Sequence, residues 1–130
     1  MSSTAAINNL TDSLESILSS LKKLPSLKVD WLIDPQKTAV IVIDMINGFV
    51  REGSLRSPRA AALIPTIVKL IKHSHEIGIP VVAFADCHPE KSVEYETFPI
   101  HAKAGTSECE IVDEIKALGR YHLINKNSTN

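Results

Sequence analysis

The sequence predicts an α/β fold, a Rossmann-like parallel sheet with flanking helices, and three observations support this class. Short apolar runs rich in β-branched residues alternate with segments of helical periodicity. The clearest run is apolar without the in–out alternation of a half-exposed strand. A continuous apolar run of this kind is typical of strands buried on both faces of a parallel sheet. A polar residue capable of chemistry follows each run, at the point where parallel sheets place their ligand sites.

The apolar pattern predicts where each element lies. We expect strands over residues 38–43, 79–85 and 121–124, and helices over residues 8–24, 60–77 and 108–118. Gly78 and Gly119 are stop signals for the second and third helices, and Thr106 or Ser107 can cap the start of the third. Pro65 either lies in the first turn of the second helix or marks its true start. The alternating order implies right-handed parallel crossovers.

Length and composition suit one domain or part of a larger one. The chain has 130 residues, 44% of them hydrophobic, and we divide it into an amphipathic helix with its connector (residues 1–30) and one α/β domain (residues 31–130). The leucine stripe of the first helix is expected to pack on the domain or on a second subunit, so a homo-oligomer is one expectation.

The same composition argues against several partners. The net charge of −1 gives no electrostatic case for nucleic acid or for an anionic membrane. The N-terminus lacks the features of a secretory signal, and no apolar run is long enough to span a bilayer. Two cysteines do not make a disulfide framework, so we expect reduced thiols in a cytoplasmic protein.

The segment 86–107 after the second predicted strand is dense in metal-ligating side chains. It contains Asp86, His88, Glu90, Glu94, Glu96 and His101. Asp86 and His88 can turn toward one ion from a single strand end, and His101 with one of the glutamates can complete mixed nitrogen and oxygen coordination. The alternative is a solvated acidic loop, which two histidines bracketed by prolines make less attractive.

Two further side chains are candidates because they also follow predicted strands. Asp44 ends the first strand, where burial would raise its pKa toward the range useful for proton transfer, although a helix cap or a turn is an equal alternative. Lys126 follows the third strand, so Asp44, Asp86 and Lys126 are expected at one edge of the sheet. A phosphatase with Asp44 as nucleophile is discounted, because the position two residues on is Ile46 and not an acid.

Taken together, these motifs resemble the isochorismatase-like cysteine hydrolases and, within them, the nicotinamidases. The matching pieces are VIVIDMINGF, ADCH, FPIHAKAGTSE and the lysine in NKNSTN. The resemblance covers roughly residues 31–130, and its specificity lies in the combined spacing, since an aspartate at a strand tip is common. It implies that the chain holds the N-terminal three strands of a six-stranded sheet.

The resemblance also implies a role for each matching residue. Asp44 matches the catalytic aspartate of the family and Lys126 its lysine. Asp86, His88 and His101 match the metal ligands, and Glu94 matches a glutamate that some members add. The implied cofactor is one divalent ion, with zinc expected first and manganese or iron as alternatives.

The implied reaction is hydrolysis of a small amide such as nicotinamide to the acid and ammonia. A thiolate attacks the carboxamide carbon, and the aspartate takes the thiol proton and delivers it to the leaving ammonia. The lysine favours the thiolate, and the metal binds the pyridine nitrogen and orients the ring. Relatives also hydrolyse isochorismate or carbamoyl compounds, so the substrate stays open.

The sequence departs from the family at the nucleophile. Cys87 lies between two expected metal ligands and Cys109 on the next predicted helix, and neither matches the family's cysteine, which follows a later strand. We therefore expect a truncated chain that is inactive alone, and note that two crossover helices cover only one face of its sheet. The alternative is an inactive homologue that acts as a ligand- or metal-binding or interaction module. The reading frame downstream of codon 130 discriminates the two, by reaching a cysteine or a stop.

Overall fold

The computed structural model describes residues 3–20 and 34–128, with side chains from residue 12 onward in the first of these ranges. The chain divides into two compact units, residues 1–32 and 33–130, and each is described by itself. The first contains helix α1 (Ser3–Ser20), which begins earlier than predicted; residues 21–24 of the predicted helix lie outside the described residues. None of the described helices has the length and apolar character needed to cross a bilayer.

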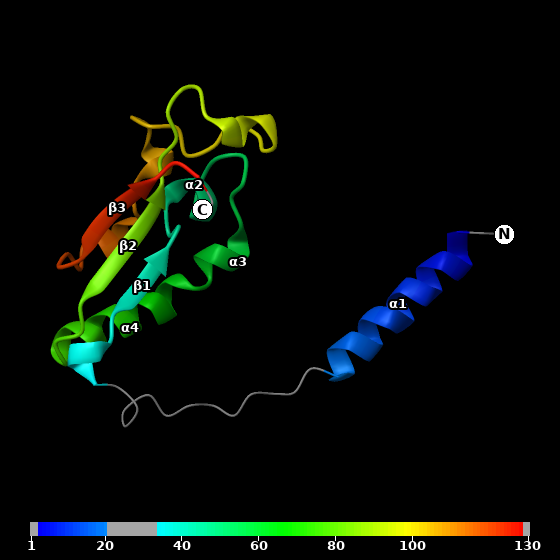
Figure 1. The fold of residues 1–130 in the computed structure, drawn as a ribbon, viewed down its shortest axis with the longest axis horizontal. Helices are drawn as coiled ribbons and strands as arrows, with labels where there is room; N and C mark the ends of the chain where they lie inside the picture. Colours follow the sequence, from blue (N-terminus) through cyan, green and yellow to red (C-terminus); the bar gives the residue numbers. More distant parts are fainter. Residues whose placement is uncertain (1–2, 21–33, 129–130) are drawn as a thin grey trace. The chain divides into compact units, whose positions relative to one another are not determined.

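The second unit is built on three parallel strands (Figure 1). They are β1 (Val40–Ile43), β2 (Val81–Asp86) and β3 (His122–Lys126), in the spatial order β1-β2-β3. The register pairs Val42 with Ala83 and Asp86 with Lys126. The predicted α/β class and parallel strands are confirmed, because each predicted apolar run became a strand and each connection crosses over to a parallel neighbour.

Short helices fill the connections between the strands. They are η2 (Pro35–Lys37), α2 (Asn47–Val50), α3 (Pro58–Ala61), α4 (Ile64–Glu76), η3 (Val93–Glu96), η4 (Ser107–Cys109) and α5 (Asp113–Lys116), where η marks a 3-10 helix. The helix predicted over 60–77 is therefore divided, and Pro65 lies in the first turn of α4, where a proline costs no hydrogen bond.

The helix predicted over residues 108–118 is wrong in its first half. Residues 110–112 are extended and pair with the segment after β1, through an antiparallel bridge between Ile46 and Ile111. The N–H of Asn47 donates to the carbonyl of Glu110 at 2.9 Å, and the N–H of Val112 donates to the carbonyl of Met45 at 3.0 Å. These tertiary hydrogen bonds override the helical periodicity and leave α5 as a single turn. Thr106 precedes η4 without a side-chain capping bond.

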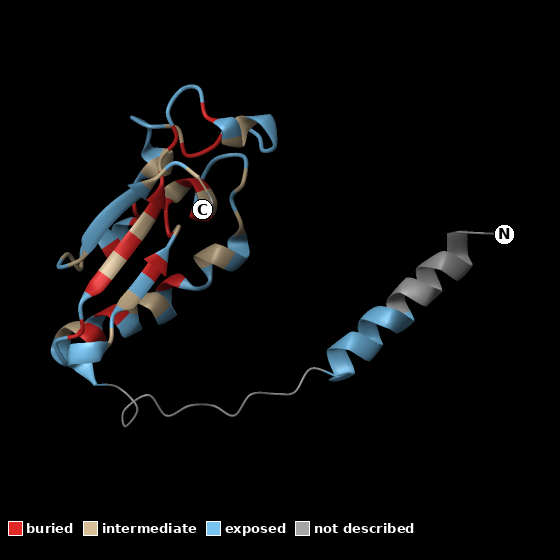
Figure 2. Ribbon diagram, viewed as in Figure 1, coloured by how far each residue is buried: buried red, intermediate tan, exposed pale blue. Residues whose placement is uncertain are grey.

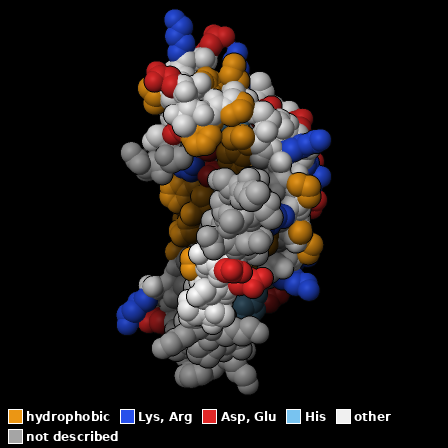
Figure 3. Space-filling view, turned by 90° about the vertical axis from the view of Figure 1, so that its right-hand side faces the viewer, with side chains coloured by type: hydrophobic (Ala, Val, Ile, Leu, Met, Phe, Trp, Pro, Cys, Tyr) orange, Lys and Arg blue, Asp and Glu red, His pale blue; other side chains and the backbone are white. Residues whose placement is uncertain are grey.

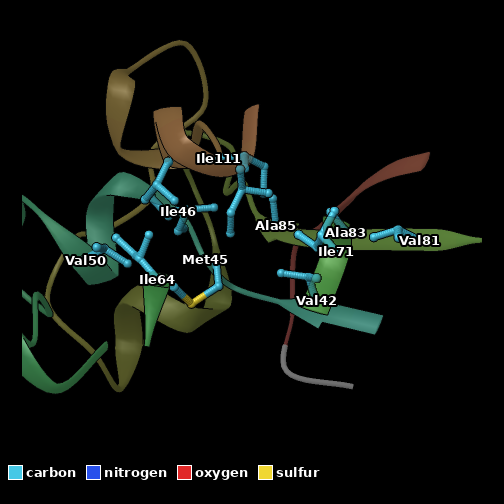
Figure 4. Packing of buried hydrophobic residues seen from close by; sticks show 13 residues of the cluster. Val42, Met45, Ile46, Val50, Ile64, Ile71, Val81, Ala83, Ala85 and Ile111 are labelled. Atoms are coloured by element: carbon cyan, nitrogen blue, oxygen red, sulfur yellow. The ribbon is translucent and has the colours of Figure 1, made fainter. Parts of the chain in front are cut away.

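The hydrophobic core lies on one face of the sheet, beneath α4 and α5. Val42 and Ala83 point from β1 and β2 toward Ile71 of α4, as Figure 4 shows. Ile115 of α5 joins the same cluster and is fully buried. Figure 2 shows the resulting contrast between the mostly buried β2 and the mostly exposed β3.

The opposite face of the sheet carries exposed apolar side chains within residues 34–128. Ile41 and Ile43 of β1 are 49% and 61% exposed, and Ile124 of β3 is 44% exposed. This confirms the expectation that the described crossover helices cover one face only, with β1 at an edge of the sheet. Hydrophobic side chains also lie beside one another on the side of the molecule seen in Figure 3.

A candidate metal site beside an aspartate–lysine pair

The carboxyl ends of the three strands bring Asp44, Asp86 and Lys126 together. Asp44 directly follows β1, and Asp86 and Lys126 are the last residues of β2 and β3. The Nζ of Lys126 lies 3.0 Å from Oδ2 of Asp44 and also donates to Oδ1 of Asp86. Oδ1 of Asp44 accepts the main-chain N–H of Asp86 at 3.2 Å. The expectation that these side chains meet at one sheet edge is confirmed.

The backbone of Asp44 is in the left-handed region, with φ at 56°. A non-glycine residue in this conformation is strained by roughly 1 kcal/mol and usually needs support from its surroundings. Here the N–H of Asp44 donates to the carbonyl of Phe84 at 2.9 Å, and both carboxylate oxygens have partners. The alternative that Asp44 caps the following helix is wrong, because Ile46 is the residue that precedes α2.

The pKa values of Asp44 and Lys126 are both raised from their ordinary values. Burial raises the pKa of Asp44, helped by the charge of Asp86 and opposed by the hydrogen bond from Lys126. Burial lowers the pKa of Lys126, but its hydrogen bonds to Asp86 and Asp44 outweigh this, so the pKa is raised. The lysine is therefore a permanent cation at neutral pH, beside a carboxylate that takes up a proton more readily than usual.

Three buried side chains next to this pair form a group that fits a metal ion. One ligand atom each from Asp86, His88 and His101 can be chosen so that all lie within 4.8 Å of one another. Nδ1 of His101 lies 2.7 Å from the carbonyl of Pro99, which leaves Nε2 of that ring for an ion. Nε2 of His88 is buried without a hydrogen-bond partner and lies 3.8 Å from Oδ2 of Asp86. A buried acceptor nitrogen without a partner, beside a carboxylate and a second imidazole, is the environment that a divalent ion satisfies.

The glutamates of the loop are placed differently from one another. Glu94 lines a cavity of about 220 Å³ and lies outside the group of ligand atoms within 4.8 Å. Glu90 instead forms an exposed ion pair with Lys103 at 3.1 Å. The cavity is lined by Asp44, Phe49, Leu55, Asp86, Glu94, Phe98 and His101, so that apolar and aromatic walls face carboxylates and an imidazole. A cavity with apolar walls and a few polar groups suits a small-molecule ligand.

Sequence reasoning missed two residues that support the site. Asn127 receives a hydrogen bond from His88, and Glu108 accepts the main-chain N–H of Ala102 at 2.8 Å. Ala102 follows His101 and has φ at 44°, so Glu108 stabilises a strained turn next to the candidate metal group. Both residues lie within the motifs FPIHAKAGTSE and NKNSTN, but residue type and spacing assigned them no role, because their contacts form only through the tertiary fold.

Cys87 lies between Asp86 and His88, and Cys109 lines a different cavity. Within the described residues, neither cysteine is hydrogen-bonded to Asp44. Burial raises the pKa of Cys87 to about 11, with a further contribution from its hydrogen bond with Cys109. The thiol of Cys109 donates to the carbonyl of Thr106 at 3.3 Å. Cys87 is therefore a thiol at neutral pH, and a thiol is a poor nucleophile.

A comparison with family models agrees with this geometry. The isochorismatase domain model matches residues 38–130, which is more than half of the chain. The chain belongs to the isochorismatase family. The match begins just before β1 and includes every residue of the metal group and of the aspartate–lysine pair.

Several solved structures of amidases have a fold similar to that of the chain. N-carbamoylsarcosine amidase from Thermoplasma acidophilum is 29% identical (TM-score 0.64; 69% of this chain and 51% of that chain covered). Pyrazinamidase of Pyrococcus horikoshii in complex with zinc is 28% identical (TM-score 0.60; 69% and 51% covered). Nicotinamidase from Bacillus subtilis is 30% identical (TM-score 0.59; 68% and 55% covered). The chain thus spans about half the length of the structures that it matches.

Proposed function

We propose that this isochorismatase-family chain carries the metal-binding and aspartate–lysine parts of an amidohydrolase site, with zinc as the ion and a small carboxamide such as nicotinamide as the substrate. One observation carries the proposal: the ammonium of Lys126 contacts both Asp44 and Asp86. A single cation therefore joins the carboxylate suited to proton transfer to the carboxylate suited to metal ligation. Similar solved structures that are named as amidases, one of them in complex with zinc, support the choice of reaction and ion.

The side chains divide the chemistry between them. Asp44 accepts the proton of a nucleophilic thiol and delivers it to the leaving ammonia, and its raised pKa suits both transfers. Lys126 keeps its charge, holds the Asp44 carboxylate in place and favours a nearby thiolate. Asp86, His88 and His101, with Glu94 at the cavity wall, would hold a divalent ion, which supplies a Lewis-acidic point for a substrate nitrogen or oxygen. The rings of Phe49 and Phe98 would confine the substrate.

The nucleophile is proposed to come from outside these 130 residues. Cys87 lies between two ligand residues, and its N–H is fixed on the carbonyl of Lys126 at 2.9 Å, so its thiol cannot easily turn toward Asp44. Cys109 is held in η4 by its own hydrogen bond to Thr106. Losing the nucleophile of such a triad costs on the order of 10⁶ in turnover.

The test compares the 130-residue chain with the chain extended along its reading frame through the next cysteine. Ammonia release from nicotinamide is measured for both after loading with zinc. Turnover by the longer form alone supports the proposal. Turnover by the short form that disappears in Cys87→Ser or Cys109→Ser contradicts it, because the nucleophile would then lie among the residues assigned no such role.

A second candidate function is supported by the state of the cysteines. The pKa of Cys87 is raised to about 11, so this cysteine is no nucleophile at neutral pH, while the candidate metal group does not depend on it. This alternative, a binding or interaction module, is favoured if the reading frame stops at codon 130 and zinc binds while no ammonia is released.

A further inference from the structure

The hydrogen bonds behind His88 converge on one residue, Asn127. Nδ1 of His88 lies 3.2 Å from both the main-chain oxygen and the Oδ1 of Asn127. Both atoms are acceptors, so Nδ1 carries the proton and Nε2 presents its lone pair. His88 is fully buried, and its Nε2 is the nitrogen without a hydrogen-bond partner in the metal group.

The same side-chain oxygen reaches a second segment of the site. The hydroxyl of Ser92 donates to Oδ1 of Asn127 at 3.3 Å, and Ser92 is 8% exposed. Ser92 directly precedes η3, and its Oγ accepts a hydrogen bond from the N–H of Glu94 at 3.3 Å. Asn127 thus connects the imidazole of His88 to the segment that carries Glu94.

Asn127 also directly follows Lys126, whose carbonyl accepts the N–H of Cys87 at 2.9 Å. The end of β3 therefore contacts Cys87, which lies between Asp86 and His88, through its main chain. The residue that follows β3 contacts His88 through its side chain. A displacement of Asn127 would alter the position of His88 and the end of the strand that carries Lys126.

We propose that Asn127 is a positioning residue of the metal site, which holds His88 with Nε2 toward the ion and, through Ser92, holds the segment of Glu94. The inference rests on the proposed metal function and adds a residue that the ligand group does not contain. Partners of this kind, which receive the second N–H of a ligand histidine, typically change metal affinity by about 10–100-fold when removed. Because the main-chain oxygen of Asn127 stays in place, we expect the lower end, about tenfold.

The experiment uses the whole chain and two readouts. Zinc affinity is measured by competition with a chromogenic chelator, and the tautomer of His88 is read from nitrogen chemical shifts in the metal-free protein. The variants are Asn127→Leu, which removes the acceptor, and Asn127→Asp, which keeps an oxygen there. Asn125→Leu is the matched control, because Asn125 lies two residues earlier, on β3, and lines a different cavity.

We expect Asn127→Leu to bind zinc about tenfold more weakly and to shift His88 away from the tautomer with the proton on Nδ1. Asn127→Asp should restore both properties, and Asn125→Leu should change neither. If Asn127→Leu matches the wild type in affinity and tautomer, the role of Asn127 is refuted while the metal site stands. If the wild type binds no zinc, the metal site itself is refuted, and the inference with it.

Discussion

Replacement of Lys126 by methionine tests the charge arrangement at the strand ends. The ammonium of Lys126 lies 3.0 Å from Asp44 and also contacts Asp86, so the variant leaves two carboxylates facing each other without a cation. Removing one partner of a fully buried pair costs about 3–5 kcal/mol, and an exposed pair contributes about 0–1 kcal/mol. The side chains of Lys126 and Asp44 are 21% and 24% exposed, between these limits, so we expect the free energy of unfolding to fall by about 2 kcal/mol.

The assay is urea unfolding in the presence of a chelator, at neutral pH and again near pH 4. The loss arises from ionised carboxylates, and the pKa of Asp44 is already raised by burial. The difference in the free energy of unfolding between wild type and Lys126→Met is therefore largest at neutral pH. It should shrink as the pH falls through the raised pKa of Asp44. Lys116→Met is the control, because Lys116 forms an exposed pair with Glu110 at 2.9 Å. Equal losses for the two variants at neutral pH, or a gap that widens on acidification, would refute the reasoning.

Two other changes test the fold around the site. Gly53→Ala and Gly78→Ala both place a side chain at positive φ, at 85° and 77°, but only the new Cβ at position 53 would lie 3.0 Å from the carboxylate of Glu108. Gly53→Ala should therefore destabilise the protein more than the roughly 1 kcal/mol expected for Gly78→Ala, as chemical denaturation would show; equal losses would mean that the carboxylate yields freely. Ile43→Lys should reduce binding of a hydrophobic fluorescent dye, because Ile43 is 61% exposed on the open sheet face, and unchanged dye binding would mean that the dye binds elsewhere.

The parts of the fold that sequence predicts well are those set by local chemistry. The β-branched run before Asp44 became β1, and Pro65 lies in the first turn of α4, because strand burial and the missing proline N–H act locally. The periodicity over residues 108–118 was misleading, since residues 110–112 instead pair with the segment after β1. A pairing between segments so distant in sequence leaves no local signal.

In the candidate site too, the residues set by local pattern could be predicted and those set by tertiary contacts could not. Asp44, Asp86 and Lys126 could be placed together in advance, because parallel strands carry their carboxyl ends to one edge. His88 and His101 were chosen by residue type and spacing, and the structure brings them together with Asp86. Asn127 and the left-handed backbone of Asp44 were not foreseen, since both depend on contacts that only the folded chain makes. The metal roles of these residues, the homo-oligomer and the cytoplasmic location stay predictions.

Zinc content tests the central claim, that the carboxyl end of β2 and the loop after it form a metal site. The chain is purified, exposed to excess zinc, freed of loose ions by gel filtration and analysed for metal alongside His88→Ala/His101→Ala. His73→Ala/His75→Ala is the matched control, because these two histidines lie on α4, outside the ligand group. We predict one zinc ion per chain in the wild type and in the control, and none in His88→Ala/His101→Ala. Equal zinc in all three proteins would contradict the account.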